Sequence, residues 1–113
     1  DLFNGTVGLS GIYSSKWYFG SYMDDLVYNN STIDYLDQMP ADHPYVEKYR
    51  SCDIVLCCGQ GDWEQEAQQD TRRMQELLGY KNIPAWIDYW GSDVVHDWPW
   101  WRKQFPYFMN RLC

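Results

Sequence analysis

The sequence contains no run of lysine or arginine that could neutralise a phosphate backbone. Its 16 acidic residues outnumber its 9 basic ones, for a formal net charge of −7, and such a balance disfavours binding to nucleic acid. No apolar run approaches the roughly 18 residues that a membrane-spanning helix needs, and the first residues lack the charged and apolar regions of a signal peptide. We therefore expect a soluble, cytoplasmic protein with no nucleic acid or membrane partner.

Metal-binding and cofactor motifs are also missing. The four cysteines form no CxxC pair and no Cys/His cluster with zinc-ligand spacing. Cys57 and Cys58 are adjacent in the apolar stretch DIVLCCG, where successive side chains point to opposite faces. This arrangement favours buried thiols over disulfides, which fits a reducing compartment. We expect no metal and no cofactor.

The hydrophobic pattern of the 113 residues predicts one α/β domain. Strands are expected at residues 6–13, 53–58 and 83–89, and the nearly continuous apolar run of the second is typical of a strand covered on both faces. Between the last two strands, residues 70–78 carry one apolar helical stripe, with Gly79 as a C-terminal stop. The pattern therefore indicates about three parallel strands with flanking helices.

Two further segments complete the chain. A closing helix is expected from the helical spacing of Trp101, Phe105, Phe108, Met109 and Leu112. Pro99 fits its first turn, whereas Pro106 is expected to kink or restart it. Residues 14–51 mix aromatics with turn formers and predict an irregular excursion with short helices, and so long a connection is usually functional. We interpret it as a cover over an active site.

Polar residues follow the second and third predicted strands. The stretch GQGDWE, with Asp62 and Glu64, follows the second strand, and His96 lies after the third. The carboxyl ends of parallel strands meet at one edge of a sheet. An acid followed by a histidine is the order of the last two members of a Ser-acid-His triad. Asp62 and His96 fit these roles, although an acid that caps the next helix and a histidine in an aromatic cluster are structural alternatives.

Four stretches carry a resemblance to a known family: DLFNGTVGLSGIY, DIVLCCGQGDWE, IPAWIDYWG and HDWPWWRKQFPYF. Over essentially the whole chain they resemble the C-terminal part of esterases of the α/β-hydrolase superfamily. These are akin to esterase-D-like enzymes, enterochelin esterases and mycolyltransferase antigens. The most specific element is H-x-W-x-x-W, matched by His96, Trp98 and Trp101. The resemblance implies a partial α/β-hydrolase fold in which His96 is the triad base.

The resemblance places the triad acid in GQGDWE. Asp62 fits the Gly-x-x-acid spacing from Gly59 and is preferred, Glu64 is its competitor, and Asp93 and Asp97 are less favoured. Trp63 and Trp98 are expected to line the substrate site, because each neighbours a proposed catalytic group.

No serine elbow accompanies this acid and base. The nearest match to G-x-S-x-G is the run from Gly8 to Ile12, in which Ile12 stands where glycine is required. The resemblance implies that Ser10 ends a later strand and lines the substrate site. We therefore expect a C-terminal fragment of a serine carboxylic-ester hydrolase for a small-molecule ester. The serine and the oxyanion-hole donors would come from a missing N-terminal half, so this chain alone is expected to be inactive.

The missing half would leave the first strand with an open edge. An unpaired edge seeks a partner, so residues 6–13 are expected to mediate self-association or pairing with the absent segment.

Two alternative functions remain open. Aromatic residues make up 19% of the chain, which suits a carbohydrate-binding module that stacks aromatic rings on sugars, although such modules are commonly all-β. The second alternative is an interaction module without catalytic activity. His43, which precedes Pro44 in a turn-like segment, is interpreted as a surface residue rather than a ligand.

Overall fold

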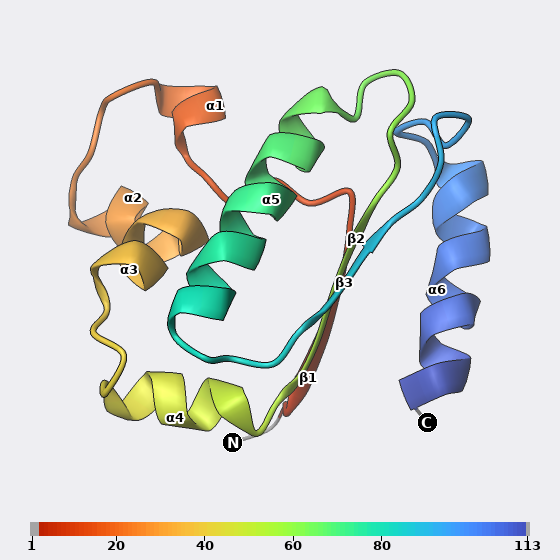
Figure 1. Ribbon diagram of the computed structural model, residues 1–113. Helices are drawn as coiled ribbons and strands as arrows, with labels where there is room; N and C mark the ends of the chain where they lie inside the picture. Colours follow the sequence, from red (N-terminus) through yellow and green to blue (C-terminus); the bar gives the residue numbers. More distant parts are fainter. Residues whose placement is uncertain (1–2, 113) are drawn as a thin grey trace.

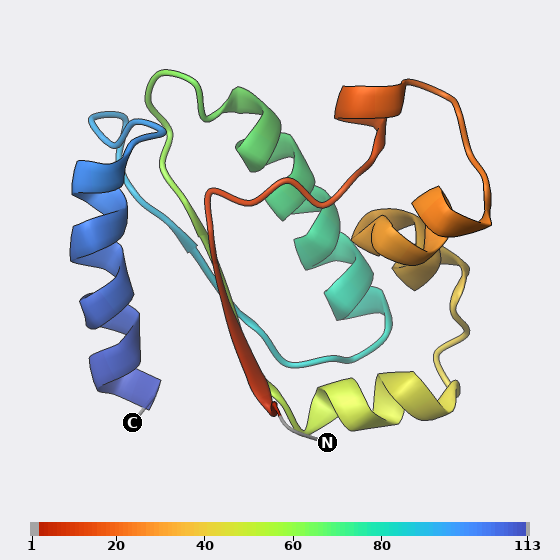
Figure 2. The same cartoon turned by 180° about the vertical axis from the view of Figure 1, so that it is seen from behind.

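A parallel sheet lies between two layers of helices in the computed structural model, which describes residues 3–112 (Figure 1). In chain order the elements are β1 (Gly5–Leu9), α1 (Lys16–Phe19), α2 (Asp25–Asn30), α3 (Thr32–Gln38), α4 (Pro44–Arg50), β2 (Asp53–Cys58), α5 (Gln65–Tyr80), β3 (Trp86–Tyr89) and α6 (Trp98–Leu112). Figures 1 and 2 show α5 on one face of the sheet and α6 on the other.

The sheet has the order β1-β2-β3, and both strand pairs are parallel. Val55 of β2 lies opposite Val7 of β1 and Trp86 of β3. The predicted α/β class with three parallel strands and flanking helices is therefore confirmed at this level. The strand-helix-strand unit β2-α5-β3 places the carboxyl ends of all three strands at the same end of the sheet, the upper end in Figure 1.

The central strand β2 connects two cores. Leu56 packs in a cluster with Met74 and Leu78 of α5, whereas Val55 and Cys57 pack with Phe108 of α6. This alternation follows from the two-residue period of a strand. Both Cys57 and Cys58 are fully buried and free, and burial raises the pKa of each thiol. The prediction of buried thiols in this strand is confirmed.

The first and third strands are shorter than predicted. β1 ends at Leu9 because Ser10, with φ 54°, leaves the extended conformation. β3 begins only at Trp86; Pro84 in the preceding segment has no N–H to give to a strand ladder.

The predicted helix ends also need correction. α5 continues past Gly79 to Tyr80, and Asn82, with φ 55°, adopts the left-handed conformation that ends many helices. α6 runs through Pro106 without restarting. The proline removes one backbone hydrogen bond, but Phe108 on its C-terminal side is fully buried against the sheet, and this packing favours a continuous helix.

The excursion of residues 14–51 forms short helices, as predicted, and lies beside α5. The buried carboxylate of Asp70 in α5 anchors its start by accepting hydrogen bonds from the main-chain N–H groups of Tyr13 (2.7 Å) and Ser14 (2.9 Å) and from Nε1 of Trp17 (2.9 Å). In Figure 1, α1 lies beside the upper part of α5, α2 and α3 lie beside its middle, and α4 lies below it, toward the lower end of the sheet. α2, α3 and α4 therefore lie away from the upper end, where the proposed catalytic loops are.

Candidate functional site

Three loops meet at the carboxyl end of the sheet: the one after β1 with Ser10, the one after β2 with Glu64, and the one after β3 with His96. The β2 and β3 loops are joined by main-chain hydrogen bonds, from Gly61 N to the Val94 carbonyl oxygen (2.9 Å) and from His96 N to the Asp62 carbonyl oxygen (3.1 Å). These bonds place His96 beside Glu64.

Glycine is required for this approach of the two loops. A Cβ atom at Gly59 would collide with the carbonyl oxygen of Val94, and one at Gly61 would lie 2.7 Å from the same oxygen. The two glycines of GQGDWE therefore let the loop that carries the acid pack directly against the loop that carries the histidine.

The carboxylate of Glu64 is fully buried (0% exposed), and both of its oxygens have hydrogen-bond partners. Its Oε1 accepts from Ser10 Oγ (2.6 Å) and from the main-chain N–H of Gly59 (3.1 Å). Its Oε2 lies 3.2 Å from His96 Nδ1. An ionised carboxylate out of water needs such partners, and here they come from the ends of all three strands.

His96 has one ring nitrogen on Glu64 and part of its ring in solvent. Its side chain is 36% exposed, and its ring meets that of Trp101 edge to face, with centroids 4.9 Å apart at 89°. Within residues 3–112 no hydrogen bond to Nε2 is found. A neutral imidazole with Nδ1–H on a carboxylate carries its lone pair on Nε2, so this atom can take a proton.

The preference for Asp62 needs correction on one point: the carboxylate that contacts the His96 ring is that of Glu64. Asp62 meets His96 only through its main-chain carbonyl. Trp63, between the two acids, has φ 67°, and Glu64 after it is buried whereas Asp62 before it is exposed. Spacing from Gly59 could not reveal this. Of the less favoured acids, Asp97 accepts from the main-chain N–H of the next residue, Trp98 (2.7 Å).

Ser10 is placed differently from the expected substrate-binding role. It is 4% exposed, its hydroxyl bonds to Glu64, and Nε1 of Trp101 donates to its Oγ at 3.1 Å. A hydroxyl engaged on both sides is turned away from solvent and from the imidazole. Trp101 belongs to the H-x-W-x-x-W element, but the sequence does not predict its contact with Ser10.

The two tryptophans expected to line the site are both exposed. Trp63 is 84% exposed in the β2 loop, and Trp98, at the start of α6, is 64% exposed. The ring of Trp98 contacts that of Trp101 edge to face at 5.2 Å, and Trp101 in turn contacts His96. Trp98 is therefore separated from the imidazole by the ring of Trp101. No ring contact is found for Trp63 among the described residues.

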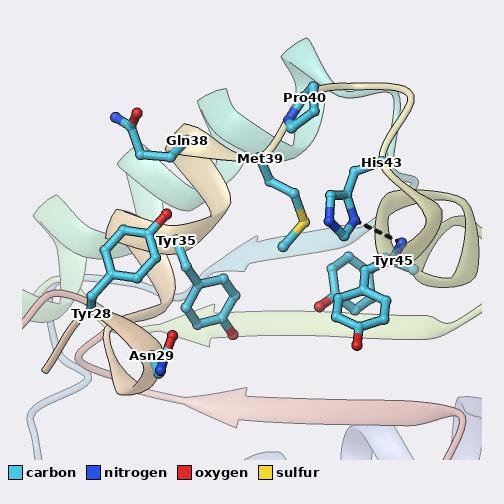
Figure 3. A pocket seen from close by; sticks show the side chains of 9 residues that line it. Tyr28, Asn29, Tyr35, Gln38, Met39, Pro40, His43 and Tyr45 are labelled. Carbon is cyan, nitrogen blue, oxygen red and sulfur yellow. Dashed lines mark hydrogen bonds between the residues drawn. The ribbon is translucent and has the colours of Figure 1, made fainter. Parts of the chain in front are cut away.

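Hollows among the described residues lie away from the Glu64–His96 pair. One of 470 Å³, shown in Figure 3, is lined by Tyr28, Asn29, Tyr35, Gln38, Met39, Pro40, His43, Tyr45 and Tyr49. There His43 Nδ1 accepts from the main-chain N–H of Tyr45 (3.0 Å) at the start of α4, which gives this histidine a structural role. Another, of 370 Å³, runs beside β1 and is lined by Gly5, Thr6, Gly8 and residues of β2, α3, α4 and α5.

The residues that the structure describes also contain no group of three or more His, Cys, Asp or Glu side chains that could hold a metal ion. None of the helices in this part of the chain has both the length and the apolar character that crossing a membrane demands.

The fold and site together define a class: a mixed α/β domain with three parallel strands and a buried glutamate paired with a half-exposed histidine at their carboxyl ends. Searches of protein-family models, curated proteins and solved structures found no match for this chain.

Proposed function

We propose that this chain supplies the acid, Glu64, and the base, His96, of a serine carboxylic-ester hydrolase, and that the nucleophilic serine comes from a segment outside these 113 residues. The observation that carries the proposal is the pairing of a fully buried carboxylate with Nδ1 of a partly exposed imidazole at 3.2 Å. The triad order along the chain and the carboxyl-end location support it.

The proposed chemistry follows from the two ring nitrogens. Glu64 keeps the proton on Nδ1, so Nε2 can accept the proton of the serine hydroxyl as the serine attacks the ester carbonyl. The same proton then passes to the departing alcohol, which leaves an acyl-enzyme. Water, activated by His96 in the same way, attacks the acyl carbonyl and releases the acid and the free serine. The exposed rings of Trp63 and Trp98 would border a small-molecule ester substrate.

An external serine is favoured because Ser10 is already committed. Its hydroxyl bonds to Glu64 rather than to His96, and it is buried. The Nε2 side of the imidazole is therefore left for a group from elsewhere.

The edge of β1 is the proposed docking place for that segment. Within residues 3–112, β1 pairs with β2 on one side and with no strand on the other. The 370 Å³ groove beside it is lined by side chains such as Leu56, Met74 and Leu78. An open strand edge next to an apolar groove favours pairing with another strand.

Without the proposed segment, we expect the chain to self-associate through this edge of β1. Light scattering should give a mass above that of a monomer, and substituting lysine for Thr6 should lower it; a monomer at all concentrations would contradict the proposal.

Hydrolysis of p-nitrophenyl acetate tests the esterase proposal. We expect the 113-residue chain to be inactive and a longer chain that adds the proposed serine-bearing segment to be active. His96→Ala should lower kcat of the longer chain by at least about 10³-fold. His43→Asn is the matched control, since asparagine retains a helix cap, and should leave kcat unchanged. Activity of the short chain that survives His96→Ala would refute the assignment.

Inactivity of both chains would favour the second candidate, a module that binds sugars through aromatic rings. The observation in its favour is the hollow of Figure 3, where four tyrosines stand beside the amides of Asn29 and Gln38. Rings for stacking and amides for hydroxyl groups are the usual means of holding a saccharide.

A cytoplasmic location is part of the proposal. It is supported by the free cysteines Cys52, Cys57 and Cys58, since unpaired thiols are typical of reducing compartments.

A further inference from the structure

The hydrogen bonds around Glu64 have a fixed direction. The indole Nε1–H of Trp101 can only donate, so it occupies a lone pair of Ser10 Oγ (3.1 Å). The hydroxyl proton of Ser10 is then directed to Glu64 Oε1 (2.6 Å), where the main-chain N–H of Gly59 also donates (3.1 Å). Two donors thus hold one oxygen of the carboxylate, and the other oxygen is left for His96 Nδ1.

The backbone of Ser10 suggests that this hydroxyl is needed. Ser10 has φ 54°, in the left-handed region where glycine is comfortable and other residues are uncommon. Such a conformation at a non-glycine residue is often found at functional sites. Glycine would suit the turn after β1 better on conformational grounds, and what serine adds is the hydroxyl on Glu64.

We propose that Ser10 is a positioning residue of the catalytic pair: supported by Trp101, it fixes the Glu64 carboxylate so that Oε2 faces His96 Nδ1. This inference rests on the proposed function and deepens it. It gives the strand-end serine a role as an orienting group for the acid, in place of nucleophile or substrate contact. It also gives the closing helix, through Trp101, a part in holding the acid as well as the base.

The first test is the tautomer of His96 in the 113-residue chain, read from ¹⁵N chemical shifts at a pH where the imidazole is neutral. The unmodified chain should show the Nδ1–H tautomer. Ser10→Gly removes the hydroxyl and is compatible with the left-handed backbone, and it should shift the population toward Nε2–H. Trp101→Phe, which keeps a ring against His96 but removes the indole donor, should shift it less.

Ser14→Ala is the matched control. It removes another buried hydroxyl from the same connection, one that bonds to the main-chain N–H of Lys16 and not to Glu64. It should leave the tautomer unchanged even if it lowers the melting temperature. A purely structural role for Ser10 would lower stability without moving the tautomer, so an unchanged tautomer in both Ser10→Gly and Trp101→Phe would overturn the inference.

The second test uses the longer, active chain. Loss of an orienting partner behind a functional group typically costs about 10- to 100-fold, so Ser10→Gly should lower kcat by that factor with KM nearly unchanged. An unchanged kcat would overturn the inference. The two proposals fail separately: if the tautomer shifts in Ser10→Gly but the unmodified longer chain hydrolyses no ester, Ser10 orients the pair and the esterase proposal is the one that fails.

Discussion

Replacing Glu64 by glutamine should lower kcat for ester hydrolysis by about 10³- to 10⁴-fold, the size of loss that a wrong histidine tautomer causes in a serine triad. The substitution keeps the shape of the side chain. Ser10 and Gly59 both donate to Oε1, so the amide oxygen should take that position and the amide NH₂ should face His96. Nδ1 would then have to accept, and the proton would sit on Nε2, where the serine must be activated.

Asp62→Asn is the matched control for this prediction. Asp62 meets His96 only through its main-chain carbonyl, which the substitution retains, so kcat should remain within about twofold, as for a surface substitution. Steady-state kinetics of both variants in the longer chain would compare the two acids. A large loss in Asp62→Asn with little loss in Glu64→Gln would restore Asp62 as the triad acid.

Phe108→Ala should destabilise the fold by about 3 to 5 kcal/mol, the usual cost of deleting a buried aromatic ring. Phe108 is 0% exposed, and its ring meets that of Trp86 edge to face at 4.9 Å. It also packs with Val55 and Cys57 of the central strand. Against a typical total of about 5 to 15 kcal/mol, this loss should leave the chain close to unfolding.

Phe105→Ala provides the comparison. Phe105 lies on the same helix but is 55% exposed, so its removal should cost less than about 1 kcal/mol. Urea unfolding followed by tryptophan fluorescence would measure both. If the two variants unfold at the same urea concentration, α6 does not pack on the sheet through Phe108.

The sequence was sufficient for the architecture because periodicity is a local property. The apolar run of residues 53–58 forms β2 at the predicted bounds, and the helical stripe of residues 70–78 lies within α5. Element ends were less predictable. The intrinsic preferences of single residues predict a helix end at Gly79 and a break at Pro106. In the structure the first helix ends near Asn82, and the burial of Phe108 favours a continuous second helix. β1 is shorter than predicted because the chain turns at Ser10.

The candidate site shows the same division. The sequence by itself determined that an acid follows one strand, a histidine the next and a serine the first, and parallel strands bring such ends together. Only the tertiary structure decided that Glu64 rather than Asp62 turns inward, and that Ser10 and Trp101 hold it. The physical reason is that a carboxylate out of water is placed by its hydrogen-bond partners, and these come from positions up to 54 residues from Glu64 in the sequence, beyond the reach of any local pattern.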